Sequence, residues 1–299
     1  MGTQFSLTFY APDSSTAHRV NQAVSARMDT LNQVMSDYLD GSEINRLSAT
    51  AGSGQWVRVS PDLFDVLQKA RSIARRSGGR FDPTVGPLSL LWRRAVRRQT
   101  FPDARERRQA RRRVGYRFVQ LDARQQRVRL RRRGMRLDLG GIGQGFANDE
   151  AARLLRSLGV GQYLLDLGGD VLAGEAPPGQ PRGWRIGTGT LATHDTATVW
   201  LTRAAITTSG DAYRHLDYQG RRYSHIMNPR SGLGLRHVVR TTVQAPEGYL
   251  ADALTKVFSV AGQSTGRRLL RRFPGARVQR LQNEEGQLRV WQSAPFGQP

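Results

Sequence analysis

The stretch with the clearest chemical potential runs from Leu137 to Asp149, where an apolar segment leads into four glycines within six residues and then into a helical pattern. Glycine permits tight turns and lets a ligand approach the main chain closely. The first N–H groups of a helix lack partners and carry a partial positive charge. A strand, a glycine turn and a helix start in this order predict a cradle for an anion or a phosphate.

The spacing of these glycines fits neither of two common nucleotide-binding patterns. The Walker pattern needs Gly-Lys-Ser/Thr, and the dinucleotide fingerprint needs G-x-G-x-x-G with an acidic residue about 20 positions further on. The residues alone are consistent both with a ligand loop and with a plain junction between a strand and a helix.

Two further side chains could contact a ligand, and each has an ordinary structural alternative. Asp82 precedes Pro83, which restricts it to extended backbone. Its carboxylate therefore projects in a fixed direction. This direction would let it bind a hydroxyl or an amide of a ligand, and it is equally ordinary for a turn residue. Tyr38 lies among polar residues in the segment 36–47. We expect it in the core, and the alternative is a platform on which a planar ring stacks.

The elements that position these residues belong to a strongly basic chain, with a formal net charge of +22 over 299 residues. Residues 93–136 contain 18 arginines and three acidic residues, so most of the excess charge lies in this one segment. All basic residues except Lys69 and Lys256 are arginine. This bias is typical of a genome-wide codon preference rather than of selection for a binding face. We expect a solvated arginine-rich surface. The alternative is polyanion binding, including peripheral contact with acidic membrane surfaces, and we do not expect a nucleic-acid partner.

Length and composition narrow the class of protein. A chain of 299 residues can bury a sizeable core, and the absence of cysteine excludes disulfides and thiolate chemistry. No run reaches the roughly 18 apolar residues of a membrane span, and the first residues alternate like a strand rather than a signal peptide. The sequence therefore leaves the compartment undetermined.

The hydrophobic periodicity predicts helices and strands in mixed order. Helices are expected at 15–35, from 61 to Gly78, at 103–113, from the glycine stretch to about 158, at 251–256 and at 265–272. Strands are expected at 3–10, 118–121, 128–130, 137–139, 163–172 with a glycine break, 184–188, 196–202, 205–208, 241–244, 276–281 and 288–291, with a hairpin turning near Gln219 and loops at 36–47 and 79–88. Because no βαβ repeat is present, we expect an α+β fold with mainly antiparallel sheets. It forms a single domain over 1–299 that includes the arginine-rich segment 93–136.

These pieces together resemble the ApbE family of FAD:protein FMN transferases, in a likeness that covers nearly the whole chain. The landmarks follow in the family's order: Met1-Gly2-Thr3, the Tyr38 loop with Ser42-Glu43, Phe81-Asp82-Pro83-Thr84-Val85-Gly86-Pro87-Leu88 with Leu91-Trp92, Leu137 to Ala147, Gly168-Gly169-Asp170, Thr208-Ser209-Gly210-Asp211, Ser224-His225-Ile226-Met227-Asn228-Pro229-Arg230-Ser231-Gly232 and Ala251-Asp252-Ala253-Leu254. Each motif is modest alone, but eight in register are hard to obtain by chance. The resemblance implies the T-fold-like architecture of these flavin transferases.

The resemblance also implies which residues bind FAD, the substrate that donates FMN. Met1 and Tyr38 match positions that pack the flavin. The positions that hold or contact FAD are matched by Arg80, Phe81, Asp82, Asp138, Gln144 and Ile226. Gln144 departs from the Lys that many members carry, so the site has one positive charge fewer near the pyrophosphate.

A Mg²⁺ ion is implied in the same way, with the Gly141 carbonyl and the Asp252 carboxylate as oxygen ligands. The family usually offers a Thr oxygen four residues after the Asp, whereas this chain has Thr255 followed by Lys256. An ammonium group cannot ligate Mg²⁺. Either Thr255 or a water fills that ligand position, or Lys256 partly substitutes for the cation and weakens the dependence on Mg²⁺.

The reaction implied by the resemblance is attack of a Thr or Ser hydroxyl of a partner protein on the FMN phosphorus, with AMP as the leaving group. His225 is the candidate base, because a neutral imidazole can take a hydroxyl proton near pH 7. The partners implied are acceptor flavoprotein subunits of membrane electron-transfer complexes, and the family is commonly periplasmic or anchored to the inner membrane in bacteria. Lys256 leaves two other functions open: FAD binding or storage without transfer, and hydrolysis of FAD to FMN and AMP.

Overall fold

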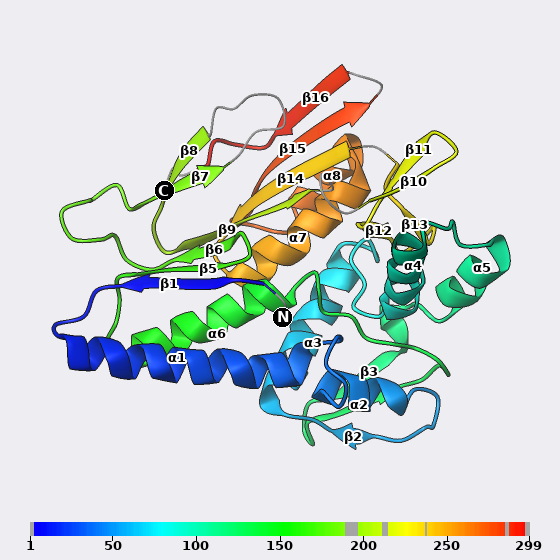
Figure 1. The fold of residues 1–299 in the computed structure, drawn as a ribbon, viewed down its shortest axis with the longest axis horizontal. Coiled ribbons are helices and arrows are strands. Elements are labelled where there is room, and N and C mark those ends of the chain that lie inside the picture. The colour runs from blue at the N-terminus through cyan, green and yellow to red at the C-terminus, as the bar shows by residue number, and fades with distance from the viewer. Residues whose placement is uncertain (1–2, 189–196, 211–214, 237, 285–286, 297–299) are drawn as a thin grey trace.

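A computed structural model describes residues 3–188, 197–210, 215–236, 238–284 and 287–296 (Figure 1). The helices are α1 (Ser14–Met35), α2 (Glu43–Ala49), α3 (Pro61–Arg76), α4 (Gly86–Arg98), α5 (Ala104–Arg112), α6 (Gly143–Ser157), α7 (Gly248–Ala261) and α8 (Gln263–Leu270), with a short 3-10 helix at Tyr116–Phe118. The strands are β1 (Phe5–Phe9), β2 (Val57–Arg58), β3 (Val119–Asp122), β4 (Arg127–Leu130), β5 (Tyr163–Leu167), β6 (Asp170–Ala173), β7 (Trp184–Thr188), β8 (Ala197–Leu201), β9 (Ala204–Gly210), β10 (His215–Tyr218), β11 (Arg221–Ser224), β12 (Met227–Asn228), β13 (Leu233–Gly234), β14 (Val238–Ala245), β15 (Arg277–Glu284) and β16 (Gln287–Gln292).

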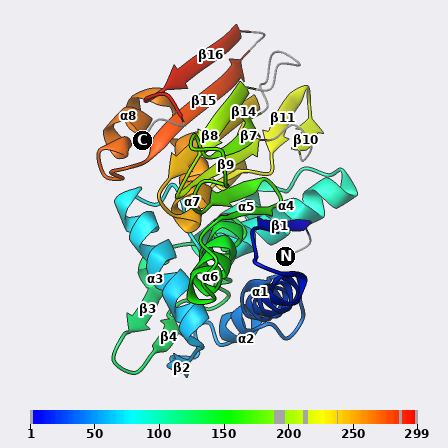
Figure 2. The same cartoon turned by 90° about the vertical axis from the view of Figure 1, so that its left-hand side faces the viewer.

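A seven-stranded sheet, in the order β1-β5-β6-β9-β14-β15-β16, forms the centre of the molecule. Every neighbouring pair in it is antiparallel. Figures 1 and 2 show α6 and α7 packed on one face of this sheet, with α1 outside α6. The three-stranded sheet β2-β4-β3 lies beside α3, and the small hairpins β10-β11 and β12-β13 lie near α4. The predicted α+β class with mainly antiparallel sheets is confirmed.

The two faces of the central sheet are covered differently. Leu165 and Ala205 face the main core, which the helices complete. Leu164 and Ile206 face the other way, where β7 and β8 pack through Trp184 and its neighbours. Because successive side chains of a strand alternate between faces, a strand covered on both sides has the continuous apolar run that the sequence shows here.

Helix α1 shows how local sequence builds this core. Asp13 caps the helix by accepting a hydrogen bond from the backbone N–H of Thr16 at 2.7 Å. Apolar residues recur at the helical period, so one face is buried: Val20, Val24, Met28, Leu31, Val34 and Met35. The helix predicted at 15–35 is therefore confirmed, as are the other predicted helices, the β3–β4 and β10–β11 hairpins, and the glycine break between β5 and β6.

The prediction of a loop over 36–47 is wrong in its second half, because α2 begins at Glu43. Ser42 Oγ accepts a hydrogen bond from Asn45 N at 3.4 Å and caps the helix. Ile44 and Leu47 are buried in the main core. The sequence contained a capping serine, but a helix of only two turns carries too little periodic signal to stand out.

The loop predicted over 79–88 is shorter than expected, because α4 begins at Gly86. Pro87 fits the first turn, where a missing N–H leaves no hydrogen bond unmade. Gly86 packs directly on the main chain of Arg136, where a Cβ would stand 2.6 Å from the carbonyl oxygen. The Gly and Pro that suggested a loop are therefore residues that a helix start at this crowded position requires.

The strand predicted at Leu137–Leu139 is also wrong. This segment is irregular: Asp138 N donates a hydrogen bond to Pro83 O at 2.8 Å, and an isolated parallel bridge joins Val85 to Arg136. Leu137 and Leu139 are nevertheless buried. A short apolar run has the same composition whether it lies in a sheet or in a buried irregular segment, so its periodicity could not separate the two.

None of the helices in the described residues combines the length and the hydropathy that crossing a membrane requires.

Candidate functional site

The glycine stretch places the start of α6 against the start of α7. The two helices cross at Gly145 and Gly248, where a Cβ on Gly248 would stand 2.5 Å from the Gly145 carbonyl oxygen. At this crossing Gly145 N donates a hydrogen bond to Asp252 Oδ2 at 3.3 Å. Ile142, the N-cap residue of α6, makes no side-chain hydrogen bond to the helix. The first turn of α6 and the fully buried Asp252 are therefore neighbours.

A carboxylate of α6 holds the start of α7 in place. Asp149 accepts hydrogen bonds from the backbone N–H groups of Gly248 and Tyr249 at 2.7 and 2.8 Å. Glu247, the N-cap residue of α7, makes no such bond with its own side chain. Burial raises the pKa of Asp149 to about 7 against the effect of the two N–H donors. Helix α7, which carries the predicted metal ligands Asp252 and Thr255, is thus tied to α6 at its N-terminal end.

Lys256 lies at the centre of the site, one helical turn after Asp252. Its Nζ is 2.6 Å from Asp252 Oδ1 and 2.8 Å from Ser209 Oγ of β9. Its aliphatic stem covers Gly141, because a Cβ on Gly141 would stand 3.3 Å from Lys256 Cγ and 3.4 Å from Cε. Burial lowers the pKa of Lys256, but the charges of Asp252 and Asp170 outweigh burial and hold this pKa above its ordinary value. Lys256 is therefore an ammonium ion at neutral pH.

A second buried carboxyl group, Asp170 at the start of β6, faces the same cluster. Burial and the charge of Asp252 raise the pKa of Asp170 to about 8, against the opposing effects of Lys256 and the Thr207 hydroxyl. Its backbone carbonyl accepts a hydrogen bond from Asn148 Nδ2 of α6 at 2.6 Å. Residues from α6, α7, β6 and β9 therefore converge on one charged cluster inside the fold.

Thr255, the predicted third metal ligand, uses its hydroxyl inside the protein. Its Oγ1 donates a hydrogen bond to the carbonyl oxygen of Asp252 at 2.6 Å and lies 2.8 Å from Ser209 Oγ. The side chain is fully buried. Its role as a metal ligand stays a prediction.

The residues beside Asp252 do not fit a divalent cation in this arrangement. Mg²⁺ needs near-octahedral oxygen ligands at about 2.1 Å, and the position in front of Asp252 Oδ1 is taken by the Lys256 ammonium. Lys256 also covers Gly141, the other predicted ligand. In the described part of the chain, no group of three His, Cys, Asp or Glu side chains could hold a metal ion.

Tyr38 is not in the core, as its sequence context led us to expect. Its side chain is 68% exposed, and the Arg93 guanidinium lies 4.1 Å above its ring. Arg93 Nη1 also pairs with Asp37 Oδ2 at 2.6 Å and Nη2 lies 3.5 Å from Asp138 Oδ2. Burial and the nearby Asp138 raise the pKa of Asp37, which Arg93 opposes. This arrangement presents an exposed aromatic face beside a carboxylate, which suits the alternative of a stacking platform.

Asp138 and Asp82 hold two neighbouring loops. Asp138 Oδ1 accepts a hydrogen bond from Gly140 N at 2.8 Å, which shapes the glycine turn. Asp82 is buried, and its two oxygens accept hydrogen bonds from Thr84 N at 2.9 Å and Tyr116 N at 2.9 Å. Burial raises the pKa of Asp82. The described contacts of Asp82 are thus those of a turn residue, and its part in FAD binding stays a prediction.

Arg80 and Phe81 are neighbours within the connection between α3 and α4. Phe81 is buried, with Cε2 3.5 Å from where a Cβ on Gly141 would stand, so it backs the glycine turn. Arg80 Nη1 donates a hydrogen bond to Ser77 O at 2.9 Å. Burial lowers the pKa of Arg80, as do the charges of Arg230, Arg268 and Arg272. This concentration of positive charge would favour an anionic ligand.

Gln144 lies in the first turn of α6, beside the β5–β6 turn. A Cβ on Gly168 would stand 3.0 Å from Gln144 Nε2. Gly168 has a φ of +65°, so this tight turn suits glycine for both its conformation and its space. Gln144, a predicted FAD contact, therefore lies within the glycine stretch and beside the landmark Gly168-Gly169-Asp170.

His225 and Ile226 come from the junction between β11 and β12. His225 is exposed, whereas Ile226 is buried with Leu235 and Val239. Ile226 N donates a hydrogen bond to Ser224 Oγ at 3.0 Å, which fixes the turn that presents His225. The predicted base is thus an accessible side chain on an ordered turn. Three other residues of the predicted motifs, Met1, Gly2 and Asp211, lie outside the described residues.

Sequence reasoning assigned no role to four residues that complete this site. Ser209 and Asp170 belong to quoted motifs, and Arg93 and Asp37 do not. The signal for Asp170 was an acid directly after a glycine pair at a strand start. Ser209 carried no such signal, because its contact with Lys256 depends on how β9 packs against α7.

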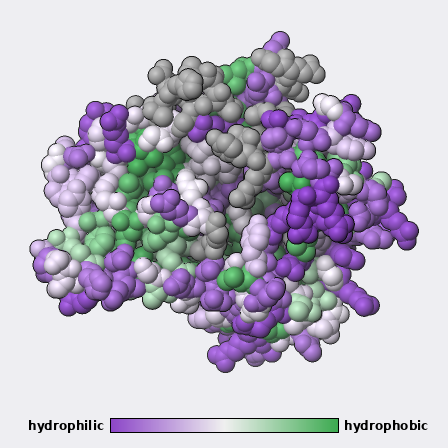
Figure 3. All heavy atoms as spheres, in the orientation of Figure 1, coloured by the Kyte–Doolittle hydropathy of each residue, from purple (hydrophilic) through white to green (hydrophobic). Residues whose placement is uncertain are grey.

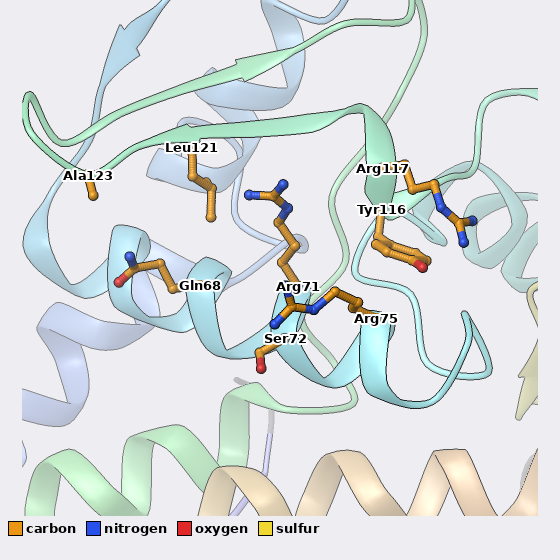
Figure 4. Close-up of a pocket in the computed structure, with 8 residues that line it drawn as sticks. All are labelled: Gln68, Arg71, Ser72, Arg75, Tyr116, Arg117, Leu121 and Ala123. Atoms are coloured by element: carbon orange, nitrogen blue, oxygen red, sulfur yellow. The ribbon is translucent and has the colours of Figure 1, made fainter. Parts of the chain in front are cut away.

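A hollow of about 480 Å³ lies elsewhere, between α3 and β3 (Figure 4). Arg71 and Arg75 on α3 and Arg117 line it, and none of the predicted site residues does. Its wall includes Tyr116, whose backbone N–H binds Asp82. Because its arginines lie on an open surface, this hollow does not replace the cluster around Asp252 as the candidate site.

The arginine-rich segment is a surface feature. Figure 3 shows hydrophilic residues gathered on the side of the molecule that carries α4 and α5. In α5 the buried residue is Ala110, and Asp103 caps the helix by accepting a hydrogen bond from Glu106 N at 2.8 Å. Most of its arginines therefore face solvent, as expected.

Comparisons with known proteins identify a family that this chain resembles over most of its length. The model of the ApbE family matches residues 1–278. An FAD:protein FMN transferase of Klebsiella pneumoniae (strain 342) is 28% identical over 304 residues, which are 99% of this chain and 86% of that protein. An FAD:protein FMN transferase of Treponema pallidum (strain Nichols) is 31% identical over 280 residues, 88% of this chain and 76% of that protein.

Solved structures show the same fold. The flavin transferase ApbE from Vibrio cholerae has a TM-score of 0.87 at 24% identity, covering 99% of this chain and 95% of that one. The apbe protein from Thermotoga maritima has a TM-score of 0.86 at 27% identity, covering 98% of this chain and 94% of that one.

Proposed function

Because this chain belongs to the ApbE family, we propose that it is an FAD:protein FMN transferase, which moves FMN from FAD onto a Thr or Ser hydroxyl of a partner flavoprotein. The observation that carries the proposal is the convergence of α6, α7, β6 and β9 on the cluster around Asp252, in a chain whose family match spans residues 1–278. FAD is the substrate, and the second product is AMP.

In the proposed reaction, the acceptor oxygen forms a bond to the FMN phosphorus. The phosphoanhydride bond to the AMP phosphate breaks, and AMP leaves with the bridging oxygen. His225 takes the proton of the attacking hydroxyl, because its exposed imidazole can accept a proton in the neutral form. No step requires an oxidant or a reductant.

The chain's own residues bind and orient FAD. Tyr38 offers an exposed ring on which the flavin stacks, with Arg93 on the ring's other face. The start of α6, with Gln144 beside it, faces the pyrophosphate and stabilises its charge through the helix dipole. The positive charge at Arg80 favours the same anionic substrate.

The acceptor belongs to the flavoprotein class. We propose a subunit of a membrane electron-transfer complex, with the arginine-rich segment 93–136 in peripheral contact with an acidic membrane surface. The net positive charge of that segment and its exposure on α4 and α5 support this contact. The resemblance also predicts Mg²⁺. The Lys256 ammonium lies where Asp252 would bind this ion, so the proposed reaction uses no metal ion.

The test is covalent flavinylation of an acceptor protein. Purified protein is incubated with FAD and an acceptor that carries a short Ser/Thr motif, and in-gel flavin fluorescence is measured after denaturation. We expect a fluorescent acceptor band. If several acceptors stay unlabelled while the protein still binds FAD, the transferase function is wrong.

The role of His225 is tested in the same assay. His225→Ala should reduce transfer by more than about tenfold, a threshold below the usual acid–base contribution of about 100-fold or more, while FAD affinity changes little. His18→Ala is the matched control, because His18 is an exposed histidine on α1. Equal transfer by the two variants would contradict the assignment of the base.

One observation favours a second function. The Lys256–Asp252 pair places a positive charge at the site without a metal ion. This charge would support FAD binding, so the alternative functions are storage of FAD and its hydrolysis to FMN and AMP without transfer. Chromatography of the nucleotides after incubation separates the three outcomes. Intact FAD indicates storage, free FMN with AMP indicates hydrolysis, and AMP with protein-bound FMN indicates transfer.

A further inference from the structure

The ammonium of Lys256 occupies a site with the features of a cation site. Its Nζ donates hydrogen bonds to the Asp252 carboxylate at 2.6 Å and to Ser209 Oγ at 2.8 Å. Asp252 is fully buried, and 25% of the Lys256 side chain is exposed. A buried carboxylate without a counter-cation is strongly unfavourable, so a cation at this position stabilises the charged form of Asp252.

Lys256 supplies that cation from the same helix. Residues four apart on a helix lie on the same face, so α7 delivers the ammonium to Asp252 without any ligand from outside. Asp170 adds a second carboxyl group that interacts with the ammonium. Of the two lysines in the chain, the other, Lys69, forms the same four-residue pair with Asp65 on α3, where both side chains are partly exposed.

The stem of Lys256 packs against Gly141, the residue that supplies the other predicted ligand. Its Cγ and Cε pack over Gly141, within 3.3 to 3.4 Å of a Cβ placed there. A divalent cation at Asp252 Oδ1 would therefore have to displace the Lys256 ammonium, whose stem packs against the neighbouring Gly141. The Thr255 hydroxyl binds Ser209 and the Asp252 carbonyl, so it would have to break these hydrogen bonds to serve as a metal ligand.

We propose that Lys256 Nζ is the resident cation of this site and replaces a divalent metal ion there. The proposal rests on the proposed function, because it concerns how the same site balances its charge. It has two consequences: the wild-type protein does not bind Mg²⁺ at Asp252, and FAD binding and flavin transfer persist in the presence of a chelator. Lys256 is here a positioning residue, which keeps Asp252 in contact with the first turn of α6.

The direct test measures Mn²⁺, a paramagnetic substitute for Mg²⁺, by electron paramagnetic resonance of the free ion. The wild-type protein should show no site with a dissociation constant below about 1 mM, whereas Lys256→Thr should create one site that binds at least about tenfold more tightly. Lys69→Thr is the matched control and should behave like the wild type. Lys256→Thr/Asp252→Asn should lose the new site.

Several results would overturn the proposal. One is a Mn²⁺ site in the wild type that is as tight as in Lys256→Thr and is lost in Asp252→Asn. Another is identical weak binding in the wild type and in a folded Lys256→Thr. If Lys256→Thr does not fold, the wild-type titration compared with Asp252→Asn decides on its own, because the proposal requires that neither protein shows a Mn²⁺ site at Asp252.

Chelator experiments separate this proposal from the proposed function. Flavin transfer and FAD affinity are measured for the wild type with EDTA and with added Mg²⁺. Equal transfer in both conditions supports the resident cation. Transfer that occurs only with Mg²⁺, together with a Mn²⁺ site at Asp252, overturns it while the transferase function stands. Absence of transfer in every condition, with no Mn²⁺ site and unchanged FAD affinity, refutes the function and leaves the resident cation supported.

Discussion

The crossing of α6 and α7 makes a sharp prediction for Gly145→Ala. A Cβ on Gly145 would stand 2.8 Å from Tyr249 N and closer still to the Gly248 carbonyl, and a Cβ on Gly248 would stand 2.5 Å from Gly145 O. Ordinary contact begins at 3.4 Å, so one methyl group added at Gly145 must push the helices apart by about 1.3 Å to clear the Gly248 carbonyl oxygen. The atoms in the way are backbone atoms, which cannot rotate aside.

The expected cost follows from this lack of freedom. Overpacking a core usually costs about 1 to 3 kcal/mol, and we expect about 3 kcal/mol here because neither helix can yield locally. For a chain of this size, that loss corresponds to a fall in Tm of about 5 to 10 °C. The hydrogen bond from Gly145 N to Asp252 Oδ2 would lengthen at the same time, so the substitution would also disturb the position of Asp252 in the site.

Thermal unfolding followed by circular dichroism measures the effect, and the same helix provides the control. A Cβ on Gly143 would lie 3.9 Å from its nearest neighbour, Leu139 Cβ, so Gly143→Ala should change stability by less than about 1 kcal/mol. In the double variant Gly145→Ala/Gly248→Ala, the second alanine should cost less than it does alone, since the helices are already apart. Equal Tm values for Gly145→Ala and Gly143→Ala would refute this account of the crossing.

Three further predictions concern other parts of the structure. Tyr38→Ala should weaken FAD binding about tenfold in a fluorescence titration without lowering Tm, because the ring is exposed and the loss is one stacking contact; unchanged affinity would contradict the platform. Arg27→Ala should cost about 2 kcal/mol in urea unfolding, because Arg27 joins Asp62 and the buried Glu150, each at 2.6 Å, and a cost below about 0.5 kcal/mol would show that the bridge is idle. Burial raises the pKa of Asp149 to about 7 from 3.8, so between these pH values the folded state keeps a proton that the unfolded state has lost. The stability that the protonated Asp149 contributes is therefore fully present below about pH 4 and is lost as the pH rises to about 7. This loss is at most about 4 kcal/mol. Asp149→Asn should flatten the pH dependence of the urea midpoint between about pH 5 and pH 8 relative to the wild type.

The sequence contained most of the secondary structure, because most elements here are long or strongly patterned. The 22-residue helix α1 repeats its apolar residues over six turns, and the β10–β11 hairpin is marked by its Gln219-Gly220 turn. The errors lie where a short signal has two structural outcomes. The segment 137–139 is buried without being a strand, and Gly86-Pro87 opens a helix that its composition argued against.

The candidate site was predictable only where its contacts lie within one element. The spacing of Asp252 and Lys256 on one helix predicted their pairing, and the structure confirms it. The approach of Ser209 to Lys256 joins residues 47 apart in the chain, and it follows from how the sheet packs on α7, which no local pattern encodes. For Tyr38 the residue type favoured burial, but Arg93 makes an exposed ring stable.

The bonds from Asp149 to the start of α7 have a consequence for how the protein folds and opens. They join residues 99 and 100 positions apart, so α7 gains its N-terminal cap only after a loop of that length has closed. The start of α7 therefore cannot become protected from hydrogen exchange independently of α6, and the two helices behave as one cooperative unit. Local fraying at the Asp252 end of α7 then requires opening of α6 as well, so the buried carboxylate of Asp252 is exposed only in rare, sub-global fluctuations rather than by the ordinary loosening of a helix end.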